Sequence, residues 1–498
     1  MTNSKLGSLA KQTAIYGLSS IIGRFLNYLL VPIHTHRMAA ESGGYGIVTN
    51  LYAYTALLLV ILTFGMETTF FRFSNKENVN PDKAFSTAGL SVGFVSLVFL
   101  LLVSLFLKPI AGALDYALHP EFVEIMAIIV AFDAFQSILF ARLRYENRPI
   151  KFMTLKLSFI VLSLLLNLFI FYLAPFLKEH YPSMMGWYQT SYQVGYIFIA
   201  NLICTTLVNF GFINEIKKLR YGIDRNLLKQ MLKYTWPILL LGLAGILNQV
   251  ADKIVFKKIV PGLEGEEQLG IYGACVKIAM IMAMITQAFR YAYEPFVFGG
   301  KRDTEDKATQ ASVMKYFIIF TLLAFLAVVM YMPLLQYLVG EGYREGLRVI
   351  PIVMMAEIFM GIYFNLSFWY KLTDQTWWGA VFSGIGCAVL LAINFIFVPK
   401  YSYMACAWGG FAGYATCMVL SYFVGQKKAP IPYDLKSAFL YFTVAIALFF
   451  VQKYIHIENT VLTLVVNTDL LMVFFAFICW REKDLVQGVL AWVKNRGK

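Results

Sequence analysis

The sequence predicts an all-α integral membrane protein with about fourteen transmembrane helices. Of its 498 residues, 59% are hydrophobic and only 14% are charged, whereas soluble domains carry about 25% charged residues. The mean hydropathy is +0.65. The net charge of +13 could suggest a nucleic-acid partner, but most Lys and Arg residues lie in short loops, where they set membrane topology. We therefore expect no nucleic-acid binding.

Apolar stretches give the helices one by one, because about 20 apolar residues cross a bilayer. The expected spans are 13–33, 45–66, 86–107, 122–141, 157–175, 187–212, 235–256, 270–292, 312–333, 349–370, 377–398, 403–424, 437–452 and 460–480. The remaining segment, 481–498, is short and amphipathic. We expect this segment to lie on the membrane surface.

Loop charge predicts the orientation of these spans. If the N terminus is cytoplasmic, the inside loops hold most Lys and Arg residues, Lys156 among them, and the outside loops hold few. This bias predicts that both termini are cytoplasmic. No small-residue cleavage site follows Lys5 and Lys11, so we expect the first span to stay in the mature protein. All six cysteines lie in apolar segments without metal spacing, and we expect them to be reduced packing residues.

Weak internal matches predict two homologous lobes of six helices. Asp82-Lys83-Ala84 recurs as Asp306-Lys307-Ala308, and Asp133 meets Glu357 at the same offset along the chain. We expect lobes at 1–218 and 219–425, followed by two added helices and a tail at 426–498. Six helices per lobe give both lobes the same orientation, which places a substrate site between them near mid-membrane.

Arg24 lies near the middle of the first expected span. A cation at that depth costs about 2.5–3.5 kcal/mol and usually faces a helix bundle or a wet cavity. Ser20, Arg24 and Asn27 share one helix face by their spacing. The structural alternative is that Arg24 snorkels or pairs with a carboxylate, although its depth makes snorkelling difficult. The sequence thus predicts a transporter with a cationic interior path.

Three further cations fall within later spans, namely Lys253, Lys277 and Arg290. We expect them, with the arginine and asparagine of the first span, to bind a diphosphate, since Arg grips phosphate bidentately and Lys supplies a point charge. Two of these cations also have a structural interpretation. Lys253 can snorkel outward with Asp252 as its local partner, and Arg290 can pair with Glu294 four residues later.

Carboxylates in the spans are candidates for ion coupling. Asp133 and Glu357 lie near the middle of their spans, and they, with Asp252, either take up a proton or Na⁺ or act as permanent counter-ions. Glu67 and Arg72 close the second span, and we expect them to act in gating or topology. The chain has no nucleotide-binding motif. We expect no cofactor and no metal site. Instead of ATP, an H⁺ or Na⁺ gradient, the membrane potential or downstream consumption of the product would drive transport.

Several short motifs carry a resemblance to a known family. The first span reads Gly-Arg-Phe-Leu-Asn-Tyr-Leu-Leu-Val-Pro at 23–32, Tyr45-Gly46 opens the second span, and Gly-Met-Glu-Thr-Thr-Phe-Phe-Arg-Phe closes it at 65–73. Over helices one to twelve the chain resembles the polysaccharide transporter, or oligosaccharide flippase, family. Its superfamily also holds lipid II flippases and multidrug exporters. In that family an arginine of the first helix lines the cavity.

The resemblance implies movement of an undecaprenyl-diphosphate-linked oligosaccharide from the inner to the outer leaflet of a bacterial cytoplasmic membrane. Lipid II flippase and cation-coupled multidrug exporter remain alternatives. An enzyme acting on the same lipid needs larger external loops than this chain provides, so we expect no catalysis. The expected partners are the lipid-linked oligosaccharide and membrane lipids, with a monomeric protein that can associate with polysaccharide polymerase machinery.

Overall fold

The protein is helical throughout the part that the structure describes. A computed structural model describes residues 28–299, 304–373, 375–455 and 457–483, and no strand occurs among them. Thirteen of its helices are long and apolar enough to cross a membrane. These correspond to the second through fourteenth expected spans, which confirms the predicted fold class. The first expected span, 13–33, lies mainly outside the described residues, as does most of the predicted surface helix 481–498.

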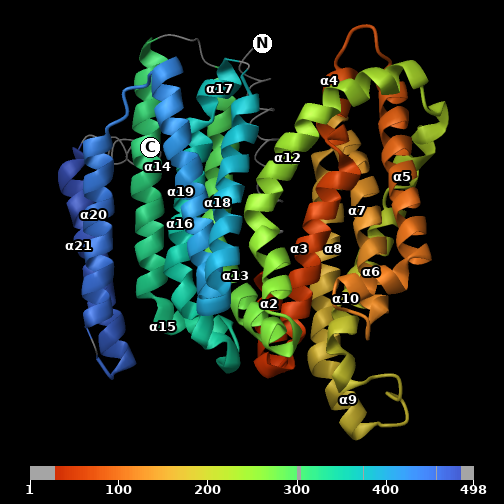
Figure 1. Ribbon diagram of the computed structural model, residues 1–498, viewed down its shortest axis with the longest axis horizontal. Coiled ribbons are helices and arrows are strands. Elements are labelled where there is room, and N and C mark those ends of the chain that lie inside the picture. Colours follow the sequence, from red (N-terminus) through yellow and green to blue (C-terminus); the bar gives the residue numbers. More distant parts are fainter. Residues whose placement is uncertain (1–27, 300–303, 374, 456, 484–498) are drawn as a thin grey trace, which may run out of the picture.

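The first part of the chain forms the helices at the red-to-yellow side of Figure 1. They are α2 (Leu30–Arg37), η1 (Ala40–Ser42), α3 (Gly44–Thr63), α4 (Met66–Ser74), α5 (Pro81–Leu105), α6 (Leu107–Ala113), α7 (Pro120–Tyr145), α8 (Pro149–Leu168), the π-helix η2 (Phe169–Leu173), α9 (Ala174–His180), η3 (Thr190–Tyr192), α10 (Gln193–Phe210), α11 (Ile213–Ile216) and η4 (Lys217–Tyr221). We call α2 to α10 the N half.

In the second part, α12 runs across from the red-to-yellow side, and the helices after it form the green-to-blue side of the same view (Figure 1). Its elements are α12 (Arg225–Ile259), α13 (Gly262–Gly299), α14 (Thr304–Met330), α15 (Met332–Leu335), η5 (Gln336–Leu338), η6 (Glu341–Val349), α16 (Ile350–Leu366), α17 (Phe368–Leu372), α18 (Trp377–Tyr401), α19 (Tyr403–Lys428), α20 (Leu435–Tyr454) and α21 (Thr460–Arg481). We call α13 to α19 the C half. The lobe boundaries near 218 and 425 stay a prediction.

The fifth expected span begins earlier than its apolar stretch suggested. Pro149 occupies the first turn of α8, where proline's fixed φ and missing N–H suit a helix start. The expected start at residue 157 was wrong because charged residues were read as loop. Lys156 is therefore two turns inside a helix and not in a loop.

Helix α12 belongs to both halves. Near its start, Leu227 and Met231 are buried in a core cluster made otherwise of N-half residues. Near its end, Phe256 is buried in the large core cluster of the C half. Between these ends, α12 contains Pro237 and is mostly exposed or half-buried. The helix therefore connects the two cores by a thinly packed middle.

Helices α20 and α21 pack against α14 at the edge of the C half (Figure 1). Asn467 donates its side-chain amide to the Met330 carbonyl at 2.6 Å, and the hydroxyls of Tyr331 and Thr468 lie 2.7 Å apart. At one end of the pair, Lys315 contacts Glu482 at 2.7 Å. These polar contacts fix which face of α21 points toward the protein.

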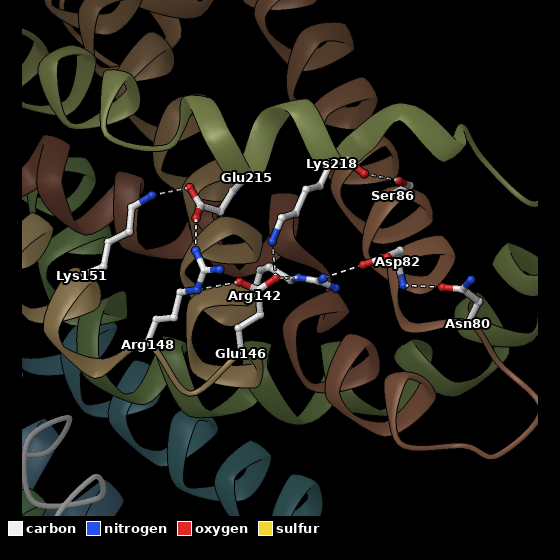
Figure 2. Close-up of polar contacts among 9 residues, drawn as sticks. All are labelled: Asn80, Asp82, Ser86, Arg142, Glu146, Arg148, Lys151, Glu215 and Lys218. Carbon is white, nitrogen blue, oxygen red and sulfur yellow. Dashed lines mark hydrogen bonds and ion pairs between the residues drawn. The ribbon is translucent and has the colours of Figure 1, made fainter.

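An ionic network ties the segment before α12 to the N half (Figure 2). It lies at the end that the loop charges predict to face the cytoplasm. The carboxylate of Glu146 accepts from Arg142 at 2.7 Å and from Lys218 at 2.5 Å. Arg142 also contacts Asp82 at 2.5 Å. The fully buried Glu215 pairs with Lys151 at 2.6 Å. Residues 215–218 are thus held by α5, α7 and α8.

We expect Glu146→Gln to lower the unfolding free energy by about 3 kcal/mol, because it leaves cations of a largely buried network without their partner. Burial alone would raise the pKa of Glu146, but Lys218 and Arg142 outweigh it, so the pKa lies below its ordinary value of 4.5. A lowered pKa stabilises the fold above that value, and the effect is lost as the pH falls. Thermal unfolding in detergent should therefore separate the variant from wild type at pH 7, and less so below pH 4.5.

Glu77→Gln is the matched control for this measurement, since Glu77 is exposed in the connection between α4 and α5. Equal Tm values for wild type and Glu146→Gln at pH 7 would contradict a stabilising role for the network.

Candidate functional site

The two halves meet where α3 crosses α13. The contact is made by glycines, because a Cβ built on Gly270 would lie 2.9 Å from the backbone nitrogen of Gly46. A Cβ on Gly46 would overlap the carbonyl oxygen of Glu266, and one on Gly273 would overlap the side chain of Thr49. The backbones approach closely because these positions have no side chain, as is common between membrane helices.

Hydrogen bonds across the halves gather at the same end. Asn50 of α3 donates to the Lys253 carbonyl of α12 at 2.8 Å, and within the N half the hydroxyl of Tyr116 donates to Asn50 at 2.9 Å. The backbone N–H of Gly340 donates to Thr35 at 3.0 Å. We call this region the closed end; it comprises residues 34–50, 113–116, 253–273 and 340–343.

Lys257 is buried at the closed end. Its ammonium contacts Glu266 at 2.6 Å and lies 3.5 Å from the centre of the Tyr116 ring. Next to it, Lys258 pairs with Asp115 at 3.1 Å. The charges of α12 and α13 thereby reach the 113–116 segment of the N half and hold this end shut.

Away from the closed end the halves diverge. Within the described residues, the only N-half elements in substantial contact with the C half are α2, η1 and α3. Helices α5, α7, α8 and α10 make no substantial contact with α14, α16, α18 or α19. The arrangement resembles a V whose vertex lies at the crossing of α3 and α13, and the loop charges predict that it opens toward the cytoplasm.

Lys277 and Lys253 lie at this vertex. Lys277 is one turn beyond Gly273 on the stripe of α13 that faces α3, and it is exposed although Gly273, Ala274 and Ile278 beside it are buried. Lys253 is near enough to act on Lys277 electrostatically. An exposed lysine on a buried helix stripe requires open space beside it. The vertex therefore presents positive charge to the space between the halves.

Lys253 is also part of an internal ion pair. Its ammonium contacts both carboxylate oxygens of Asp252 at 3.0 Å. Asp252 is buried and accepts a hydrogen bond from the Tyr272 hydroxyl at 2.8 Å. The local partner expected for Lys253 is present, and 18% of the lysine side chain remains exposed. Lys277 is accordingly the more available of the two cations.

The other predicted cations are not brought to this point. Arg290 is thirteen residues further along α13, about 20 Å by helical rise, and its guanidinium lies 4.7 Å from the Phe364 ring centre. The helical rotation between the two positions puts Arg290 on a different face from Lys277. Arg24 and Asn27 lie outside the described residues, as does the side chain of Glu294.

The predicted acids occupy the interiors of the two halves. In the C half, Glu357 of α16 and Asp252 of α12 both act electrostatically on the buried Tyr414 of α19. Asn248 lies one turn from Asp252 and donates to the Ser383 carbonyl at 2.7 Å. In the N half, Asp133 of α7 is half-buried. Glu357 and Asp133 thus have different surroundings.

Lys156 is a site residue that the sequence reasoning missed. It lies on the stripe of α8 that also carries the buried Phe152 and Ile160, yet it is exposed. Its ammonium is 4.1 Å from the Phe140 ring centre and acts electrostatically on Asp133 and Glu67. Lys156 is therefore a second inward-facing cation, on the N half. The Pro149 helix start was the sequence signal that could have placed it inside a span.

Glu67 and Arg72 lie on α4, where the second span ends. Glu67 forms an ion pair with Arg144 of α7. The guanidinium of Arg72 lies 4.0 Å from the ring centre of Tyr234, in the first half of α12. Both side chains therefore join elements at the predicted cytoplasmic end, and their role in gating stays a prediction. All six cysteines are free, five of them buried and Cys479 half-buried, as expected.

Comparison with known protein families identifies the family of this chain. The sequence profile of the family described as "Polysaccharide biosynthesis protein" matches residues 9–297. The chain belongs to this family. No curated protein sequence matches it significantly.

Several solved structures of transporters have a similar fold. The lipid II flippase MurJ in an inward closed conformation is similar with a TM-score of 0.70 at 14% identity, over 94% of this chain and 99% of that one. An inward-facing multidrug resistance MATE transporter gives 0.64 at 14%, over 81% and 94%. The MATE multidrug transporter DinF-BH gives 0.60 at 14%, over 86% and 96%. This family member therefore has the fold of MurJ and MATE transporters.

Proposed function

We propose that this protein moves an oligosaccharide linked to undecaprenyl diphosphate from the cytoplasmic to the outer leaflet by alternating access. The observation that carries the proposal is the cationic vertex, where Lys277 is exposed between the halves next to Lys253. A diphosphate is an anion that such a site would favour, since charge-assisted bonds to phosphate oxygens are strong. Membership of a polysaccharide biosynthesis family supports a sugar as the cargo.

The two halves supply the cations from opposite sides. Lys277 comes from α13 and Lys156 from α8, both on stripes that otherwise face protein. Arg24 and Arg290 remain predicted contributors, the first from the N half and the second deeper along α13. A diphosphate held between the halves would link them electrostatically, and the polar sugar would remain in the space that opens toward the cytoplasm. Rocking of the halves about the vertex would then expose the site to the outside.

The experiment that tests this function is depletion of the protein in its own cells, followed by extraction of lipids and mass spectrometry. We expect an undecaprenyl-diphosphate oligosaccharide to accumulate and to be inaccessible to a membrane-impermeant reagent added outside. Accumulation of lipid II instead would favour a peptidoglycan precursor flippase, the alternative suggested by the likeness to MurJ. Unchanged lipid-linked sugars together with drug sensitivity would favour a multidrug exporter and contradict the proposal.

The coupling ion would bind in the C half. Asp252 is already paired with Lys253, whereas one carboxylate oxygen of Glu357 is buried, and a carboxylate in low dielectric favours uptake of a proton or cation. Asp133 has Lys156 near it instead, and we assign it the role of counter-ion to that lysine. We expect Glu357→Gln to reduce transport driven by an imposed H⁺ or Na⁺ gradient in proteoliposomes to the rate seen without a gradient.

Asp133→Asn is the matched variant for this assay, since it neutralises the corresponding acid of the other half. It should leave the response to the gradient in place. If both variants respond to the gradient as wild type does, the carboxylates are structural and coupling lies elsewhere.

A further inference from the structure

Helix α21 carries a carboxylate on its outward face. Asp469 is the tenth residue of this 22-residue span and is exposed. The residues on the same stripe are large, apolar and at least half exposed, namely Leu462, Val465, Met472, Val473 and Trp480. We call this set, with Asp469, the outer stripe of α21.

The opposite face of α21 is fixed against the protein. Asn467 is 2% exposed and donates to the Met330 carbonyl at 2.6 Å. Phe474 and Ile478 are buried on the same side. Asp469 is two residues from Asn467, a rotation that places it nearly opposite. Its side chain therefore points away from the molecule, and a position near the middle of a membrane span is expected to face lipid hydrocarbon.

Asp469 has no partner in the part of the chain that the structure describes. No hydrogen bond or ion pair to its carboxylate occurs there, although its neighbour Thr468 bonds with Tyr331 at 2.7 Å. Lipid tails cannot hydrogen-bond to a carboxylate, and intramembrane acids are consequently found paired or facing water. Among the described residues, the Asp469 carboxylate is neither paired nor directed toward the interior of the protein.

We propose that the outer stripe of α21 docks a transmembrane helix of a different membrane protein, and that this helix carries an arginine or lysine opposite Asp469. The apolar side chains above and below would pack against the partner helix, and the ion pair would fix its depth and register. Polar contacts between membrane helices act in this way because hydrocarbon offers no competing partner. The inference does not depend on the proposed transport activity.

A second copy of this chain does not fit the stripe. A symmetric contact would place two Asp469 carboxylates together, which are like charges. An asymmetric contact would need a cation on a lipid-facing surface at mid-membrane. Away from the ends of the described spans, the cations are Lys156, Lys253, Lys277, Arg290 and Lys315, and they lie on protein-facing stripes, against Phe364 or paired with Glu482. Charge complementarity therefore points to another protein.

Site-specific photocrosslinking in the native membrane tests this docking. A benzoylphenylalanine replaces Val465 or Met472 in the full-length chain, and the same label at Ile396 of α18, which is 66% exposed, is the control. We expect a discrete adduct with one other membrane protein from the two α21 positions and not from the control. Asp469→Lys and Asp469→Asn should each lower the yield of the adduct by roughly tenfold or more, because each variant removes the ion pair between the two helices.

Peptide mapping of the adduct completes the test. The crosslinked partner segment should be a membrane helix with an arginine or lysine within one turn, and replacing that cation by aspartate should restore the adduct with Asp469→Lys. An adduct insensitive to both Asp469 variants would overturn the inference. So would an adduct between two copies of this chain, crosslinks to lipid only, or a partner helix without a cation. If Asp469→Lys fails to insert, Asp469→Asn decides.

Discussion

Lys277→Glu is expected to abolish translocation of the lipid-linked oligosaccharide while leaving the protein folded in the membrane. Lys277 is exposed at the vertex and makes no structural ion pair among the described residues, so its charge is available for a ligand. Losing a charge-assisted contact in a partly desolvated site costs about 2–5 kcal/mol, which is roughly 30-fold to several thousand-fold in affinity. The loss of translocation is measured in proteoliposomes that contain a fluorescent lipid-linked oligosaccharide.

Two further variants make this result specific. Lys277→Arg keeps the charge and should retain more transport than Lys277→Ala. Lys453→Glu makes the same charge change at an exposed lysine near the end of α20 and should transport normally. Wild-type rates for a folded Lys277→Glu protein would remove the vertex as the anion site.

Gly46→Val is expected to prevent the closed end from forming. Any Cβ at residue 46 would overlap the Glu266 carbonyl oxygen, and backbone cannot move aside as a flexible side chain does. The variant should therefore occupy conformations in which α3 and α13 are apart at this end. A cysteine at Asn50 should react with an impermeant maleimide added outside in Gly46→Val cells, and far more slowly in the wild-type background.

Gly93→Val is the control for this labelling, because a Cβ at Gly93 of α5 lies 3.4 Å from its nearest atom, in the Phe135 ring. This variant should label as wild type does. Slow labelling in Gly46→Val would mean that the closed end tolerates the added side chain. Closure would then not depend on the glycines at the crossing of α3 and α13.

The fold could be predicted from the sequence because the length of each apolar stretch and the charge of each loop can be counted along the chain. Thirteen spans appear where the apolar stretches lie. The predicted start of the fifth span was wrong for a definite reason. Lys151 and Lys156 shorten the continuous apolar stretch, although the helix α8 begins at Pro149. A lysine inside a bundle is stabilised by tertiary neighbours, here Asp133 and Phe140, which a one-dimensional count does not contain.

The sequence predicts a chemistry for the site, which stays a prediction, but not the arrangement of its residues. Cations within spans pointed to an anionic ligand, yet spacing along a helix did not reveal that Lys253 and Lys277 meet through a crossing with α3. The same limit applies to Asp252 and Glu357, which lie far apart in sequence and share Tyr414 as a neighbour. Contacts between helices decide which charges face each other, and those contacts depend on glycines such as Gly270.

The anchored segment before α12 determines where motion between the halves can be absorbed. Because Glu215 and Lys218 are held by the N half (Figure 2), the chain between the halves has no slack there. The start of α12 must travel with one core and its end with the other. In the proposed rocking of the halves, relative rotation would be taken up as bending of α12 around Pro237, which lacks the N–H for one backbone bond. The bending stiffness of α12 alone would then set how readily the protein switches between its inward-open and outward-open conformations.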